Sequence, residues 1–146
     1  MYKHILVAVD ESDTAKQALR EAISLSQEHK AKLRLVHVVN FYSGYLVAGV
    51  DYDQLELSFK QGAQKLLDEM EAAARKEHIE CDVQLIEIKS QERISEKIVE
   101  AAKDWGADLL VVGTHGRRGF QHFILGSVAE GVIRGASTPV LLVRGQ

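Results

Sequence analysis

Several glycines lie in the stretch VVGTHGRRGFQHFILGSVAEGVI, and the spacing of three of them suits a phosphate. Gly113 is followed three residues later by Gly116, and nine residues separate Gly116 from the pair Gly126 and Ser127. Glycine lets a backbone approach a ligand closely, and the N–H groups at a helix start favour an anion. A serine hydroxyl there can cap the helix or donate to a phosphate oxygen. The spacing therefore predicts a phosphate-binding loop.

Charge in the same stretch supports this interpretation. Arg117 and Arg118 are basic, and no acidic residue lies between Gly113 and Ser127. His115 and His122 are weaker candidates, because a lone histidine in a loop is more often solvated and is largely neutral at pH 7. The sequence leaves open whether Arg118 and the two histidines touch phosphate.

Alternating elements must position this loop. Short apolar, β-branched runs typical of buried strands alternate with segments whose apolar residues recur at helical spacing. The alternation predicts one α/β domain over residues 1–146, with an open, five-stranded parallel sheet and helices on both faces. The expected strands are HILVAVD, RLVHVV, DVQLIEI, DLLVVG and PVLLV, and the second expected helix spans 55–76.

Ligands of such sheets bind where the strand order reverses, at the carboxyl ends of the strands. With the strand order 3-2-1-4-5, which we infer from the fold class, the first and fourth strands are neighbours there. Asp10 ends the first strand and Gly113 ends the fourth. A carboxylate at Asp10 can accept hydrogen bonds from ribose hydroxyls. Its alternative role is to cap the following helix, although Ser12 or Asp13 can do that as well.

The pattern G-x2-G-x9-G-[ST] resembles the signature of the ATP-binding branch of the universal stress protein family. Gly113, Gly116, Gly126 and Ser127 match it, and the likeness extends from MYKHILVAVDES to GSVAEGVIRGASTPVLLVR. The resemblance implies an adenine nucleotide alpha hydrolase-like α/β sandwich. It also implies a stress-responsive regulatory protein that binds ATP with Mg²⁺ and signals through a dimer or an unknown regulatory partner.

The resemblance also implies roles for individual residues. Asp10 would hold ribose, Val9 and Val38 would flank adenine, and Val38 would do so through its main chain. Val112 and Val128 border the glycine motif in the same way. All four valines also suit the core of the sheet, and both roles can hold together. Arg117 is expected at the phosphates, and we expect neither a catalytic residue nor a protein-bound metal.

Two other classes of function fit the sequence less well. A slow ATPase is the alternative, with Mg²⁺ bridging the phosphates and Arg117 stabilising charge, but the motif has no nearby general base and no Walker pattern. A flavodoxin-like FMN carrier would need its phosphate loop after the first strand. That position reads DESDTA, whose three acids repel phosphate.

The composition limits the classes of binding partner and the cellular compartment that we expect. The chain has 146 residues, a formal net charge of -3 and one cysteine, Cys81. These values disfavour general nucleic-acid or membrane binding, and the lone cysteine fits a buried hydrophobe in a reducing compartment. No apolar stretch is long enough to cross a bilayer, so we expect a cytoplasmic protein.

The segment from Asn40 to Asp53 is irregular. Its aromatic residues suit loop packing better than a lid over the nucleotide; they are Phe41, Tyr42 and Tyr45.

The last strand predicts a homodimer. Val140 to Val143 are consecutive apolar residues, and the 3-2-1-4-5 order puts them at the sheet edge. Natural proteins usually cover such an edge, and a second copy can do so about a two-fold axis. The alternative is that a helix or loop of the same chain covers it.

Overall fold

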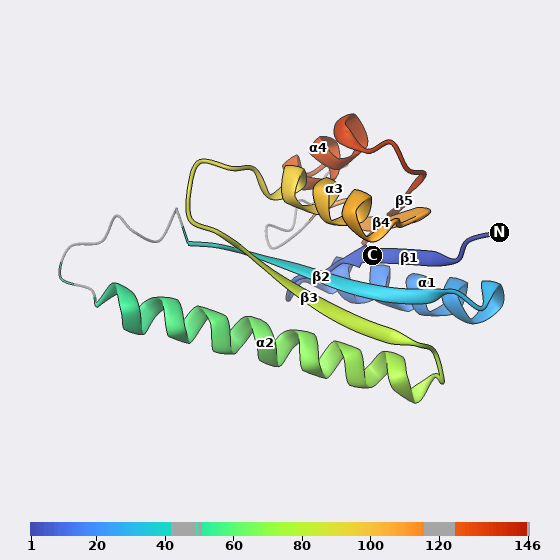
Figure 1. Ribbon diagram of the computed structural model, residues 1–146, viewed down its shortest axis with the longest axis horizontal. Helices are drawn as coiled ribbons and strands as arrows, with labels where there is room; N and C mark the ends of the chain where they lie inside the picture. Colours follow the sequence, from blue (N-terminus) through green and yellow to red (C-terminus); the bar gives the residue numbers. More distant parts are fainter. Residues whose placement is uncertain (42–48, 50, 116–124, 146) are drawn as a thin grey trace.

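The computed structural model describes residues 1–41, 49, 51–115 and 125–145. Within these residues, five strands and four helices alternate, as the sequence predicts (Figure 1). The strands are β1 (His4–Ala8), β2 (Lys32–Asn40), β3 (Cys81–Ile88), β4 (Leu109–Gly113) and β5 (Val140–Val143). The helices are α1 (Asp13–His29), α2 (Tyr52–Lys76), α3 (Ile94–Trp105) and α4 (Ser127–Gly135).

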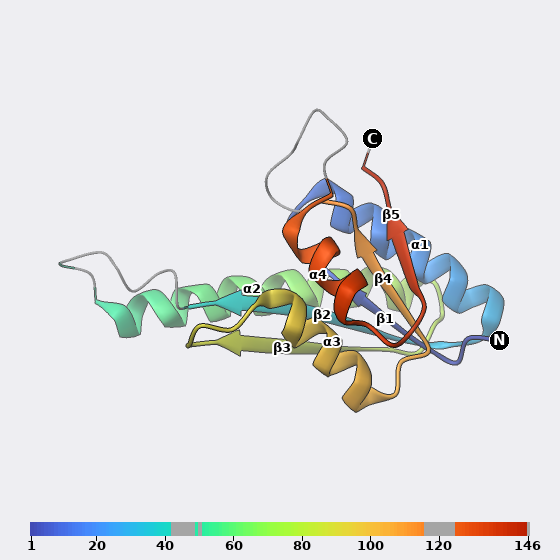
Figure 2. The same cartoon turned by 90° about the horizontal axis from the view of Figure 1, so that it is seen from above.

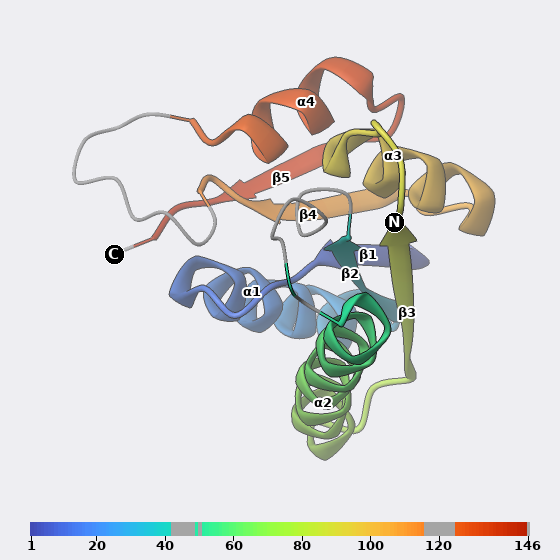
Figure 3. The same cartoon turned by 90° about the vertical axis from the view of Figure 1, so that its left-hand side faces the viewer.

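All strand pairs are parallel, and the order across the sheet is β3-β2-β1-β4-β5. This confirms the predicted fold and the 3-2-1-4-5 order. Two helices cover each face, α1 and α2 on one and α3 and α4 on the other, as the view in Figure 3 makes plain. The central strands β1 and β4 are therefore buried on both sides.

Alternation along the strands divides the core into two layers. Val7 and Val111 pack toward α1 and α2, whereas Leu6 and Leu110 pack toward α3 and α4. All four side chains are fully buried. This double burial explains why the strands are continuous apolar runs in the sequence.

Polar side chains define where two of the helices begin. The Ser12 hydroxyl accepts a hydrogen bond from the Ala15 N–H at 3.1 Å, which makes Ser12 the cap of α1. The Asp51 carboxylate accepts from the N–H groups of Asp53 and Gln54. For that reason α2 begins at Tyr52, three residues before the apolar pattern that predicted it.

Candidate functional site

The carboxyl ends of β1 and β4 lie side by side in the middle of the sheet. The two strands pair from Ile5 and Leu109 to Val7 and Val111. From β1 the chain enters α1 and continues to β2, while from β4 it reaches α4 and then β5 on the opposite side. The strand order thus reverses between β1 and β4, and Figure 2 shows β2 and β5 on opposite sides of this pair of strands.

Asp10 lies directly after this end of β1. Its Oδ1 atom accepts a hydrogen bond from the Ser12 N–H at 2.8 Å, which closes a tight turn. Because Ser12 caps α1, the alternative role of Asp10 as the helix cap is wrong. A carboxylate has more accepting positions than this one bond uses, and Asp10 is only half-buried. Its carboxylate is therefore available to a ligand that offers hydroxyl donors.

Val9 and Val38 lie where the ladder between β1 and β2 ends. The paired register stops at Ala8 and Val36, and one further bond runs from the Val9 N–H to the Val36 carbonyl at 2.9 Å. Backbone groups of alternate residues in a strand point toward the same neighbour, so those of Val38 point to the side where β1 has already ended. Both valine side chains are buried, consistent with their predicted second role in the core.

The end of β4 packs closely against the start of α1. A Cβ atom placed on Gly113 would lie 2.6 Å from the Cγ2 atom of Thr14, so a larger residue fits here only if Thr14 shifts. Val112 is buried in the core beneath α3 and α4. The next residue, Thr114, donates its N–H to the Val143 carbonyl at 2.9 Å, and its hydroxyl lies 3.0 Å from the Nδ1 atom of His115.

The second half of the motif opens α4. Gly126 donates its N–H to the Thr114 carbonyl at 2.7 Å, which joins the start of α4 to the end of β4. Gly126 is itself the cap residue and makes no side-chain bond, so the suggestion that Ser127 caps this helix is wrong. Ser127 is the first residue of α4. Val128 is half-buried against the core. The N–H groups of the first turn are the kind that favours anions.

Several predicted residues lie outside the part of the chain that the structure describes. They are Gly116, Arg117, Arg118, His122, Tyr42 and Tyr45. Phe41, which is described, is only 3% exposed and stacks on Phe59 with a ring distance of 6.2 Å. This contact fits the loop-packing prediction for that residue.

Two groups beside the site could not be identified from the sequence. His37 was only one of several scattered histidines, yet its Nδ1 atom lies 2.8 Å from the Val9 carbonyl oxygen. Thr14 was not singled out, although it contacts Gly113 and is 5% exposed. Both contacts join segments distant in sequence, and only the strand register brings them together.

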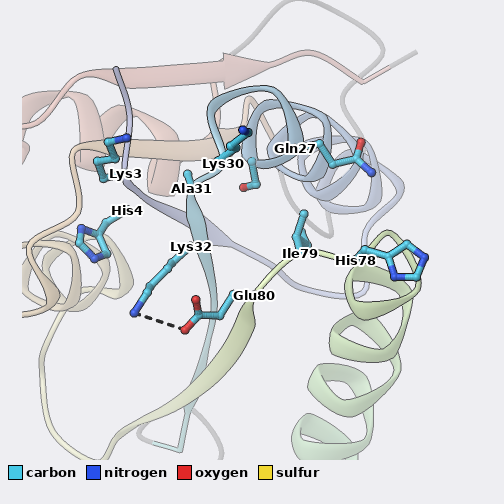
Figure 4. Close-up of a pocket in the computed structure, with 10 residues that line it drawn as sticks. Lys3, His4, Gln27, Lys30, Ala31, Lys32, His78, Ile79 and Glu80 are labelled. Carbon is cyan, nitrogen blue, oxygen red and sulfur yellow. Dashed lines mark ion pairs between the residues drawn. The ribbon is translucent and has the colours of Figure 1, made fainter.

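A cavity of about 490 Å³ lies at the other end of the sheet, among the loops that precede β1, β2 and β3 (Figure 4). Lys3, Lys30 and Lys32 line it, and Lys32 pairs with Glu80 at 3.3 Å. The carboxyl end of α1 also borders it, and the partial negative charge of a helix carboxyl end disfavours phosphate. The three lysine side chains are exposed, so this cavity is the weaker candidate.

Within residues 1–41, 49, 51–115 and 125–145, no cluster of three or more His, Cys, Asp or Glu side chains could hold a metal ion. In the same ranges, none of the helices is long and apolar enough to span a membrane.

The Cys81 thiol is buried beneath α2, and this burial raises its pKa to about 12.

Known proteins resemble this chain over nearly its whole length. The model of the Universal stress protein family matches residues 1–144. "Universal stress protein A homolog 2" of Coxiella burnetii is 36% identical, with 98% of this chain and 95% of that protein covered. These matches agree with the resemblance that the glycine motif indicated.

Solved structures resemble the fold as well. A crystal structure of a universal stress protein family member from Burkholderia pseudomallei has a TM-score of 0.79 at 33% identity, covering 97% of this chain and 96% of that one. The universal stress protein from Archaeoglobus fulgidus in complex with dAMP has a TM-score of 0.70 at 28% identity, covering 97% and 98%.

Proposed function

The chain belongs to the universal stress protein family, and from that premise we propose that it binds an adenine nucleotide, ATP with Mg²⁺, as a regulatory protein. One observation carries the proposal. Asp10, the end of β4 at Gly113 and the start of α4 at Gly126 converge where the strand order reverses. The dAMP complex of a relative supports the same ligand class.

Each part of ATP has a matching group in this arrangement. The first-turn N–H groups of α4, the Ser127 hydroxyl and the close backbone approach allowed by Gly113, Gly116 and Gly126 suit the phosphates. Arg117 adds charge that a phosphate pairs with readily. Mg²⁺ would arrive with the phosphates, since this ion is usually held by them together with water.

The nucleoside would lie along the ends of β1 and β2. The Asp10 carboxylate accepts hydrogen bonds from ribose hydroxyls. The Val38 backbone, beyond the last paired residue of β1, faces the edge of adenine. Val9, Val112 and Val128 supply apolar contacts to the base. Nucleotide occupancy would then be read by a second copy of the chain or by a regulatory partner.

Calorimetric titration with ATP tests this proposal. Asp10→Ala removes the ribose acceptor, and we expect affinity to fall roughly tenfold to a hundredfold, as for a lost hydrogen bond to a charged group. Asp13→Ala is the matched control. Its exposed carboxylate lies only three residues away and pairs with Lys16 at 3.8 Å. Equal affinity of the Asp10→Ala variant and the wild type would contradict the ribose role, and absence of ATP binding by the wild type would contradict the function.

A separate experiment tests the proposed contacts with the phosphates of ATP. Arg117→Ala with Arg118→Ala should weaken ATP more than adenosine, because only ATP presents phosphates. An exposed contact is worth about 1 kcal/mol or less, and a desolvated charged hydrogen bond about 1.5–3 kcal/mol. Equal losses for both ligands would place these arginines away from the phosphates.

A further inference from the structure

A side chain takes the place of a backbone bond at the end of β1. The Nδ1 atom of His37 lies 2.8 Å from the Val9 carbonyl oxygen, and His37 is only 5% exposed. A carbonyl oxygen accepts and never donates, so Nδ1 must carry the proton. The bond therefore fixes the histidine ring as a donor at this atom, and in the neutral ring the other nitrogen is an acceptor.

The register identifies what the imidazole replaces. In a pair of parallel strands, a residue donates its N–H to the carbonyl of one residue of the neighbouring strand. Its own carbonyl accepts from the N–H two residues further along that neighbouring strand. The Val9 N–H bonds the Val36 carbonyl, so the regular donor to the Val9 carbonyl would be the Val38 N–H. Between these two described residues that backbone bond is not made, and the donor to the Val9 carbonyl is the ring of His37, one residue before Val38.

We propose that His37 is a positioning residue for recognition of the adenine base. By donating to the Val9 carbonyl, it holds this peptide in a position in which the Val38 N–H does not bond it, and that N–H is left for the base. It also fixes the peptide that joins Val9 to Asp10, and with it the carboxylate that faces ribose. This inference rests on the proposed function, because it concerns the same nucleotide site.

Base selectivity follows from this role. A backbone N–H and C=O pair matches adenine, which offers a ring-nitrogen acceptor beside an amino donor. Guanine offers a ring N–H beside a carbonyl, so the backbone N–H would face a donor and the backbone C=O would face an acceptor. A base site that loses its fixed backbone should therefore lose preference as well as affinity, since discrimination depends on mismatched groups being left unpaired.

Two substitutions separate the hydrogen bond from packing. His37→Leu removes the donor at similar size, whereas His37→Asn keeps an N–H donor close to the position of Nδ1. We expect His37→Leu to weaken ATP by roughly twofold to tenfold and to reduce the ATP-over-GTP preference. His37→Asn should restore much of both. His4→Leu is the control, because His4 lies at the opposite end of the sheet against Trp105 and should change neither.

The outcomes distinguish the two proposals. If the wild type binds no adenine nucleotide, the proposed function fails; nitrogen NMR of the ligand-free protein still reports whether His37 carries its proton on Nδ1. If the wild type binds ATP and His37→Leu keeps its affinity and selectivity, the positioning role is wrong and the function stands. Equal losses in His37→Leu and His37→Asn that track unfolding by urea would also overturn it, because they would indicate a merely structural residue. Should His37→Leu fail to fold, the His37→Asn variant and the NMR measurement decide.

Discussion

The methyl carbon of Thr14 in α1 packs against Gly113 at the end of β4. A Cβ atom added to Gly113 would lie 2.6 Å from the Thr14 Cγ2 atom and 3.3 Å from its Cβ atom. Such a distance is well below ordinary carbon–carbon contact, and Thr14 is buried. This contact brings the start of α1 against the end of β4, which are the two sides of the candidate site.

The contact predicts the effect of a methyl group at Gly113. Gly113→Ala should destabilise the protein by about 1–3 kcal/mol, the usual cost of overpacking. Adding Thr14→Ser should recover part of that loss, because serine lacks the clashing Cγ2 atom. Urea unfolding of the two single variants and the double variant measures this coupling. Strictly additive effects would show that the two residues do not meet as described.

The start of α4 is also tightly packed at a glycine. A Cβ atom on Gly126 would lie 3.1 Å from the Thr114 carbonyl oxygen and 3.2 Å from the His115 Cα atom. Gly126→Val should therefore displace the phosphate loop and abolish measurable ATP binding. We also expect this of Gly116→Val, on the glycine motif alone.

Gly62 provides the matched control for these glycine substitutions. It lies within α2, and a Cβ atom there would meet no atom within 4 Å. Gly62→Ala should leave ATP binding unchanged and stabilise the helix by up to about 1 kcal/mol. Wild-type ATP affinity in a folded Gly126→Val variant would contradict the phosphate-loop interpretation.

The buried thiol predicts a pH dependence of stability. Burial raises the pKa of Cys81 to about 12 in the folded protein, whereas an unfolded thiol ionises at about 8.5. Above that pH the unfolded state releases the proton and the folded state retains it, so stability falls as pH rises. Cys81→Ala should show a shallower fall in urea unfolding at alkaline pH. Identical slopes for the two proteins would contradict the assignment.

A homodimer through β5 is the fourth prediction. β5 is an edge strand of the sheet, and all four of its side chains are only half-buried. Pairing with a second copy would satisfy its free edge. We expect a dimer at tens of micromolar by sedimentation equilibrium, and we expect one of the two single variants, Leu142→Lys or Val143→Lys, to dissociate it. These two side chains face opposite layers of the core, so the variants are tested singly. A wild-type monomer with and without ATP would contradict the prediction.

The sequence predicted the sheet well for a physical reason. Strands buried on both faces, such as β1 and β4, must be continuously apolar, and parallel strands need helical crossovers. The order 3-2-1-4-5 came from the fold class, and the observed pairing confirms it. The start of α2 was placed too late, because its cap at Asp51 precedes the apolar pattern.

The candidate site was predictable only in part. Asp10, Gly113 and Gly126 were identified because spacing and strand ends are properties of the sequence. The bond from His37 to Val9 depends on the register between two strands, and periodicity does not determine that register. The same holds for Thr14 against Gly113. Ser127 was predicted as a candidate cap of α4, but the cap position is Gly126, which has no side chain to make a capping hydrogen bond.

Amide chemical shifts during an ATP titration test the central claim most directly. Binding at the carboxyl ends of the strands should shift the amides of Asp10, Val38, Gly126 and Ser127 in one saturable transition. The amides of Lys30 and His78, which line the cavity at the opposite end, should remain unchanged. Shifts confined to that cavity, or none at millimolar ATP, would contradict an adenine-nucleotide site between β1 and β4.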